Sequence, residues 1–272
     1  MTRFEPLEAF HGFDKKQNWQ MVPLGGSRGL RLLEGPDMDL VVWRRGGTIG
    51  GVTFDEVAVP MPGQREIWVQ GHALGEYVLE AHDRGSGKIQ AKTDLEVLRE
   101  REIKIAYFNV SDMVGHETEF SQTPQLHKMA NAILFPQANI KCTSLGLRWA
   151  SASIANLGDS VDVDASSGIL RSSGSHESAD LQVYFVWRIK SDEKGKPPPL
   201  GITLGGVTLI SPQPSIDGMA ATLAHEIGHF AVIGSKEPNH DMDSKENLMY
   251  KTSPHGTYMS RERILRTVIR SF

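Results

Sequence analysis

The chain has 272 residues, enough for one large or two ordinary domains, and its 39% hydrophobic and 23% charged residues are typical of a soluble globular protein. Its net charge of −4 shows none of the basic excess of a nucleic-acid-binding protein, and no apolar run approaches the length that crosses a membrane. Cys142 is the only cysteine, which excludes an internal disulfide, and we expect it to be a small buried residue of a strand.

The first eight residues, Met1 to Glu8, lack the apolar core of a signal peptide. We therefore expect a protein that works in the cytoplasm, that has lost a leader, or that leaves the cell by a signal-independent route.

Residues 1–100 have the rhythm of an all-β domain. Short runs of β-branched and aromatic residues alternate with Gly- and Pro-rich turns, and no long helical pattern interrupts them. The expected strands lie at 40–43, 51–54, 66–70 and 76–80. The stretch from Trp68 to Ala81 resembles a bacterial Ig-like domain, which implies a small sandwich-like fold over 1–100.

The rhythm changes near residue 101. A strand is expected at 103–110, and Thr123-Pro124 is a typical opening of a helix with apolar residues on one face. Further strands are expected at 140–149, 181–187 and 202–210. The acidic segment 162–168 lacks the spacing of a calcium loop and is predicted to be a turn. Residues 101–272 are therefore predicted to form a second domain, and the whole chain an α+β protein.

A metal-binding motif follows in the pentapeptide His225-Glu226-Ile227-Gly228-His229. Apolar residues before and after it recur at helical spacing, and Asp217 is a candidate N-cap. Residues four apart share one face of a helix, so His225 and His229 can bind one ion while Glu226 lies beside it. This pattern, HExxH, is the signature of zinc hydrolases.

The sequence beyond this motif resembles the metzincin family of zinc peptidases. His240 and the segment Asn247-Leu248-Met249-Tyr250 stand where that family has its third His ligand and a turn carrying Met. The usual spacing is HExxHxxGxxH, whereas here Val232 and Ser235 occupy the Gly and His positions, and Gly234 and His240 come later.

The resemblance implies zinc bound by His225, His229 and His240, with Met249 below the metal. Because the spacing is irregular, other donors stay open as the third ligand: Asp241, Asp243, Glu246, His255 and Glu262.

The resemblance also implies a zinc-dependent endopeptidase with a mixed, twisted sheet and a C-terminal helix. Glu226 would act as general base toward a metal-activated water, and Tyr250 or Tyr258 would stabilise the transition state. A peptide or protein substrate would pair with the strand 201–210, where Gly205 and Gly206 would allow close backbone approach.

Two other functions stay open from the sequence. One is a non-catalytic adhesion or scaffold module that holds a structural zinc, although Glu226 argues against it because a structural metal needs no general base. The other is a toxin-like protease effector whose N-terminal domain binds a delivery or attachment partner.

Overall fold

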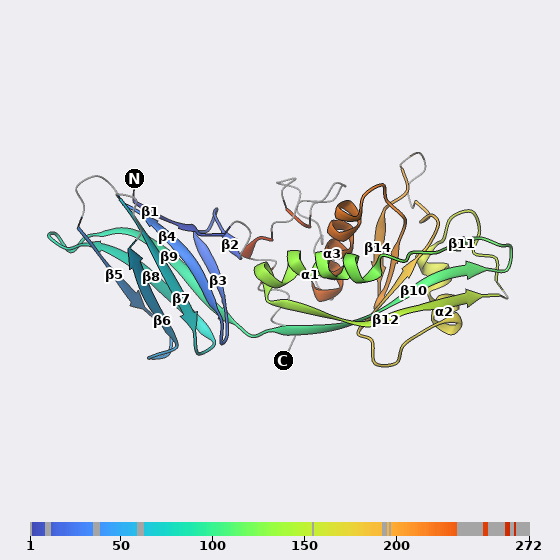
Figure 1. Ribbon diagram of the computed structural model, residues 1–272, viewed down its shortest axis with the longest axis horizontal. Coiled ribbons are helices and arrows are strands. Elements are labelled where there is room, and N and C mark those ends of the chain that lie inside the picture. Colours follow the sequence, from blue (N-terminus) through green and yellow to red (C-terminus); the bar gives the residue numbers. More distant parts are fainter. Residues whose placement is uncertain are drawn as a thin grey trace. The chain divides into compact units, whose positions relative to one another are not determined.

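The structure is a computed structural model of the full chain (Figure 1). It describes the following residues: 2–8, 12–34, 39–58, 63–153, 155–191, 195, 197–232, 247–249, 259–261 and 264. It is an α+β protein, rich in strands. Across these residues, no helix is both long and apolar enough to span a membrane.

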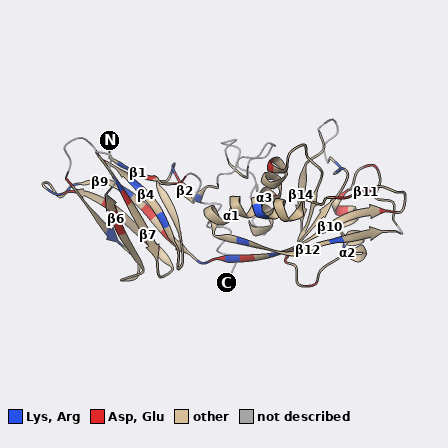
Figure 2. Ribbon diagram, viewed as in Figure 1, with Lys and Arg blue, Asp and Glu red and all other residues tan. Residues whose placement is uncertain are grey.

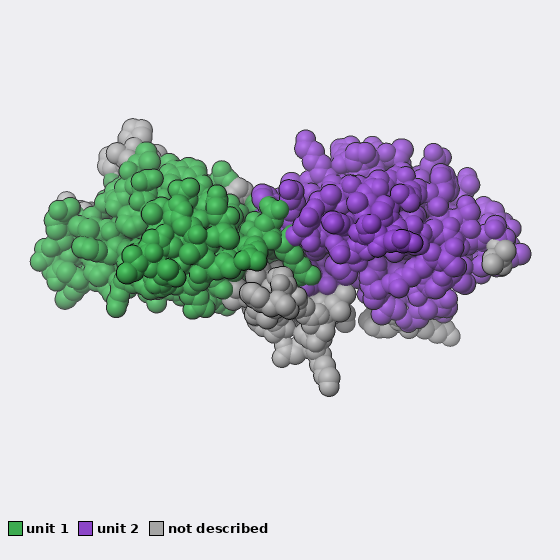
Figure 3. Space-filling view, turned by 90° about the horizontal axis from the view of Figure 1, so that it is seen from below, with its two compact units in different colours: residues 1–101, 136–139, 259–272 green, residues 102–135, 140–258 purple. Residues whose placement is uncertain are grey.

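The chain divides into two compact units (Figure 3). Unit 1 contains Met1–Arg101, Pro136–Asn139 and Met259–Phe272, and unit 2 contains Glu102–Phe135 and Ile140–Tyr258. Two short segments from beyond residue 101 therefore group with the N-terminal unit, which a single cut at residue 100 does not foresee. The division at residue 100 and the independent folding of 101–272 stay predictions.

Unit 1 is built from two sheets that share one apolar core. The first sheet has the order β1-β4-β7-β6, all antiparallel, with these bounds: β1 Arg3–Pro6, β4 Ser27–Leu33, β7 Gln64–Gly71 and β6 Val52–Ala58. The second has the order β2-β3-β9-β8-β5, with these bounds: β2 Phe13–Asp14, β3 Trp19–Pro23, β9 Ile89–Leu98, β8 Gly75–Asp83 and β5 Leu40–Arg45.

The core of unit 1 follows from side chains that alternate along each strand. Leu30 and Ile67 of the first sheet belong to the same buried cluster as Leu79 and Leu95 of the second. Charged residues occur along β4 and β7 (Figure 2), and Arg31 of β4 lies opposite Glu66 of β7 at positions that alternate with the buried residues. This alternation explains why the strand rhythm was readable from the sequence.

Unit 2 contains a six-stranded mixed sheet with the order β11-β10-β13-β15-β14, in which β12 also pairs with β10. Its strands have these bounds: β10 Arg101–Asp112, β11 Glu117–Thr118, β12 Ile140–Ala152, β13 Leu181–Phe185, β14 Gly201–Leu204 and β15 Val207–Ile210. Strands β10, β13 and β15 are parallel, whereas β14 runs antiparallel to β15 and forms one edge.

Helices cover both faces of this sheet. The helices are α1 Thr123–Ala138, α2 Val163–Ser173 and α3 Ile216–Val232. Phe108 of β10 shares a buried cluster with Leu170 of α2. Its neighbour Tyr107 points to the opposite face, where its hydroxyl lies 2.8 Å from Nδ1 of His127 on α1. Thr203 and Thr208 lie on the same side as α3.

One local expectation needs correction and another is confirmed. The segment predicted to be a turn at 162–168 instead starts α2, because the side chain of Asp162 accepts hydrogen bonds from the backbone amides of Asp164 and Ala165. An Asp that caps these amides begins a helix rather than ending one. Cys142 is buried in β12, as predicted, and burial raises the pKa of its thiol to about 12.

Candidate metal centre

Helix α3 carries the HExxH motif and is almost entirely buried. Ser215 precedes it, and the Ser215 hydroxyl oxygen accepts a hydrogen bond of 3.1 Å from the amide of Gly218. Ser215 is therefore the N-cap, whereas Asp217, the predicted cap, lies in the first turn, where a carboxylate favours the positive end of the helix dipole. The apolar residues Leu223, Ala224 and Ile227 are fully buried, which fixes the rotation of the helix and the direction of the motif.

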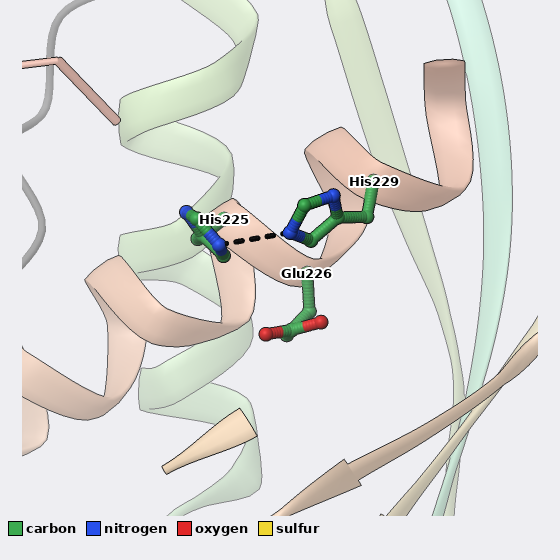
Figure 4. Close-up of side chains that lie close together, drawn as sticks. All are labelled: His225, Glu226 and His229. Carbon is green, nitrogen blue, oxygen red and sulfur yellow. Dashed lines mark hydrogen bonds between the residues drawn. The ribbon is translucent and has the colours of Figure 1, made fainter. Parts of the chain in front are cut away.

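The two histidines of the motif face each other. Their Nε2 atoms lie 2.9 Å apart and their rings are perpendicular (Figure 4). Two imidazoles on one tetrahedral zinc, with Zn–N bonds of about 2.0–2.1 Å, bring their nitrogens to roughly 3.3 Å. The two nitrogens are thus already close to the separation that a shared ion requires.

A backbone carbonyl orients the first histidine. Nδ1 of His225 lies 2.6 Å from the carbonyl oxygen of Leu248. A carbonyl only accepts, so Nδ1 carries the proton and Nε2 offers its lone pair. This is the arrangement that metal-bound histidines commonly show, in which the second ring nitrogen donates to a carbonyl and fixes the ligand.

The segment that supplies this carbonyl is a tight turn. The Asn247 side chain accepts a hydrogen bond of 2.8 Å from the amide of Met249, and Asn247, Leu248 and Met249 are all buried. A Cβ atom at Gly228 would lie only 2.5 Å from the sulfur of Met249. The glycine inside the motif therefore lets the thioether lie directly against α3, one residue before His229.

Glu226 is the third member of the group. Only 4% of it is exposed, and burial raises the pKa of its carboxyl to about 8, an effect that a hydrogen bond from Thr203 partly offsets. Its Oε2 atom has no hydrogen-bond partner within the described part of the chain. A buried carboxylate oxygen without a partner is costly unless a ligand meets it, so this atom is suited to contact a substrate or a water.

The residue types and spacing fit a zinc ion. One ligand atom each from His225, Glu226 and His229 lies within 4.8 Å of the others. Imidazole nitrogen is a preferred zinc donor, and the tautomer set by Leu248 presents the correct nitrogen.

The prediction of one continuous strand over 201–210 needs correction, whereas the role of Gly205 and Gly206 in substrate approach stays a prediction. Both residues have positive φ angles, +54° and +83°, and they form the two-residue turn between β14 and β15. Turns of this kind need left-handed backbone, which glycine adopts without strain. The edge strand is Gly201–Leu204 alone, not a continuous strand over 201–210.

The glycine that approaches the site is Gly201. A Cβ atom there would lie 2.8 Å from Cγ and Oε1 of Glu226 and from Cγ2 of Thr222. No pattern in the sequence marks this glycine, because the contact joins β14 to α3 through space. The contact of the Leu248 carbonyl with His225 could not be predicted from the sequence either, because every residue has a backbone carbonyl.

Several predicted site residues lie outside the described residues. These are the third ligand His240, its alternatives Asp241, Asp243, Glu246, His255 and Glu262, and the predicted transition-state groups Tyr250 and Tyr258.

Comparison with known proteins gives partial likenesses of fold. No protein-family model matches the chain, and no curated protein matches it. Archaemetzincin from Methanopyrus kandleri is similar over 62% of this chain and 97% of its own, with 13% identity and a TM-score of 0.44. The Escherichia coli adhesin FdeC is similar over 36% of this chain and 30% of its own, with 14% identity and a TM-score of 0.27. Tandem Ig repeats of Dlar are similar over 32% of this chain and 53% of their own, with 15% identity and a TM-score of 0.22. At these values the likenesses assign no activity.

Proposed function

We propose that this protein is a zinc-dependent endopeptidase with a metzincin-like catalytic unit. One observation carries the proposal: the Nε2 atoms of His225 and His229 lie 2.9 Å apart, and the carbonyl of Leu248 fixes the tautomer of His225. Two histidines that occur by chance on a surface helix would be exposed. Here His225 is buried, and its Nδ1 is hydrogen-bonded to the carbonyl of Leu248 in a turn 23 residues later.

His225 and His229 would hold the zinc ion, with His240 as the proposed third ligand. Two imidazoles from one helix cannot complete a tetrahedral site, so a further protein group has to come from beyond α3. When bound, zinc polarises the scissile carbonyl and lowers the pKa of a water to about 7.

Glu226 would act as the general base in its ionised form, which the positive charge of a bound zinc would favour against the effect of burial. Its carboxylate is buried beside both histidines and has an oxygen with no partner among the described residues. It would take a proton from the attacking water and then deliver it to the leaving amine of the cleaved peptide. Met249, packed against Gly228, would keep the space below the ligands filled and apolar.

The substrate is proposed to be an extended peptide bound along β14. This strand forms an edge of the sheet, and Gly201 at its start lies against Glu226. An edge strand has unpaired backbone groups, which a peptide can complete by adding one more strand. A peptide paired there would therefore lie next to the proposed base.

Metal analysis and a peptide-library digest test the proposal together. The purified wild-type protein should contain one zinc per chain and cleave peptides internally. Glu226→Gln should keep the zinc and lose activity by on the order of a hundredfold or more, because an amide cannot accept the proton. His225→Ala and His229→Ala should lose both.

His72→Ala is the matched control, because His72 is an exposed histidine of unit 1 that contacts Thr53. This variant should keep full zinc and full activity. Zinc retained in both His225→Ala and His229→Ala would contradict the proposed metal site. Unchanged turnover in Glu226→Gln would show that Glu226 is not the general base. His240→Ala separately tests the third ligand.

A further inference from the structure

Unit 1 has a cavity lined only by its own residues. It has a volume of about 500 Å³ and lies where β5 and β8 pair, on the second sheet. Leu40 and Val42 of β5 point into the sandwich core, so the alternate residues Val41 and Trp43 point outward. Strand β5 is at the end of its sheet in the described part of the chain.

Trp43 forms an exposed aromatic wall of this cavity. It is 58% exposed, and its cross-strand partner on β8 is Glu80. A tryptophan on a solvent-facing strand normally buries its ring or finds a partner, because the indole is the largest apolar side chain. A flat indole face in an open cavity is suited to stack against the face of a ring.

The buried carboxylate of Glu80 also lines the cavity, and each of its oxygens contacts a basic side chain. Glu80 has only 7% of its side chain exposed, and its Oε2 lies 2.9 Å from Nε2 of His82. Its Oε1 lies 3.4 Å from a guanidinium nitrogen of Arg45. Both oxygens are therefore oriented, and the group can accept further hydrogen bonds from a ligand at defined angles.

Exposed positive charge also lines the cavity. The side chains of Arg45 and Arg84 are 69% and 66% exposed, and Arg44 also lines the cavity. Arg84 pairs with Asp39 at 2.9 Å, and Asp39 is itself 71% exposed, so this pair is weak and readily exchanged. An incoming carboxylate can be bound by such guanidinium groups through two parallel hydrogen bonds.

We propose that this cavity binds an acidic oligosaccharide, with a sugar ring stacked on Trp43 and its carboxylate held by Arg45 and Arg84. The lining has three arginines, Arg44, Arg45 and Arg84, and two carboxylates, Glu80 and Asp83. The mixture of donors and acceptors suits a ring with many hydroxyl groups, each of which both donates and accepts. The two carboxylates repel any anion, but a triphosphate brings several negative charges to one spot whereas each acidic sugar ring brings one, which makes a nucleotide the poorer ligand.

This site is independent of the proposed peptidase activity, since every residue in it belongs to unit 1. It gives a chemical identity to the attachment partner expected for the N-terminal domain: an acidic glycan rather than a protein.

Calorimetric titration of the full-length protein with an oligogalacturonate tests the proposal, with a neutral maltooligosaccharide of equal length and ATP as comparison ligands. We expect binding of the oligogalacturonate that weakens with salt, and weaker binding of both comparison ligands. Trp43→Ala should weaken binding about tenfold or more, and Arg45→Ala with Arg84→Ala should abolish the preference for the acidic sugar.

Two matched controls keep the test independent of folding. Trp68→Ala removes another exposed tryptophan of the same unit, 39% exposed on β7, and Arg3→Ala removes another exposed arginine. Both should bind as the wild type does. Equal affinity for the neutral sugar would overturn the role of the arginines, tighter binding of ATP would overturn the ligand class, and no binding of any sugar would overturn the site.

Discussion

Because Gly228 packs against Met249, we expect a Gly→Ala substitution to destabilise the protein at Gly228 of α3 and to stabilise it at Gly168 of α2. Gly228 on α3 and Gly168 on α2 are both helical glycines without positive φ. A Cβ atom at Gly168 would meet nothing within 4 Å, whereas one at Gly228 would lie 2.5 Å from the sulfur of Met249. The two positions therefore differ in available space rather than in backbone conformation.

The expected magnitudes follow from this difference. Replacing glycine by alanine in an open helix stabilises it by about 1 kcal/mol. Forcing an extra methyl group into a closely packed core costs about 1–3 kcal/mol. We therefore expect Gly168→Ala to raise the free energy of unfolding by about 1 kcal/mol, and Gly228→Ala to lower it by about 1 kcal/mol, since the clash of about 2 kcal/mol exceeds the helix gain.

Urea denaturation followed by the helical circular dichroism signal measures both variants, because α2 and α3 belong to unit 2. Zinc affinity gives a second measurement. Met249 directly follows Leu248, whose carbonyl orients His225, so we expect Gly228→Ala to weaken zinc binding and Gly168→Ala to leave it unchanged. Equal stabilisation by both substitutions, with unchanged zinc affinity, would refute the close packing of Met249 on α3.

Three further outcomes are expected. Gly201→Ala should reduce peptide hydrolysis while zinc stays bound, because its Cβ would press on the Glu226 side chain; wild-type turnover in a kinetic assay would contradict this. Burial lowers the pKa of His127 below 6.5, although its bond to the Cys142 carbonyl opposes this, so the folded protein favours the neutral ring. The unfolded chain therefore binds more protons than the folded protein as the pH falls below about 6.5, and the free energy of unfolding should decrease between pH 7 and pH 5. In His127→Gln this decrease should be smaller than in the wild type. Finally, the Cys142 thiol, with its pKa raised to about 12, should not react with a thiol reagent at pH 8 until denaturant is added; rapid labelling of the native protein would show that it is accessible.

The sequence predicted those features that depend on local periodicity. Alternating apolar residues gave the strand rhythm of unit 1, and the spacing of four between His225 and His229 placed both on one face of a helix. A helix or strand repeats its geometry every few residues, so the spacing of apolar residues along the sequence indicates which of the two will form. The α+β class followed from the same patterns. The prediction of a turn at 162–168 is wrong because Asp is favoured both in turns and at helix N-caps, and Asp162 caps α2.

Only the tertiary structure decided how the candidate site is assembled. The carbonyl of Leu248 reaches His225 across 23 residues of sequence, and Gly201 meets Glu226 because β14 and α3 pack together. Gly205 and Gly206 turn the chain between β14 and β15, so the segment predicted as one strand is two. These outcomes depend on which surfaces bury each other, and burial is a property of the whole packed unit rather than of any short stretch of residues.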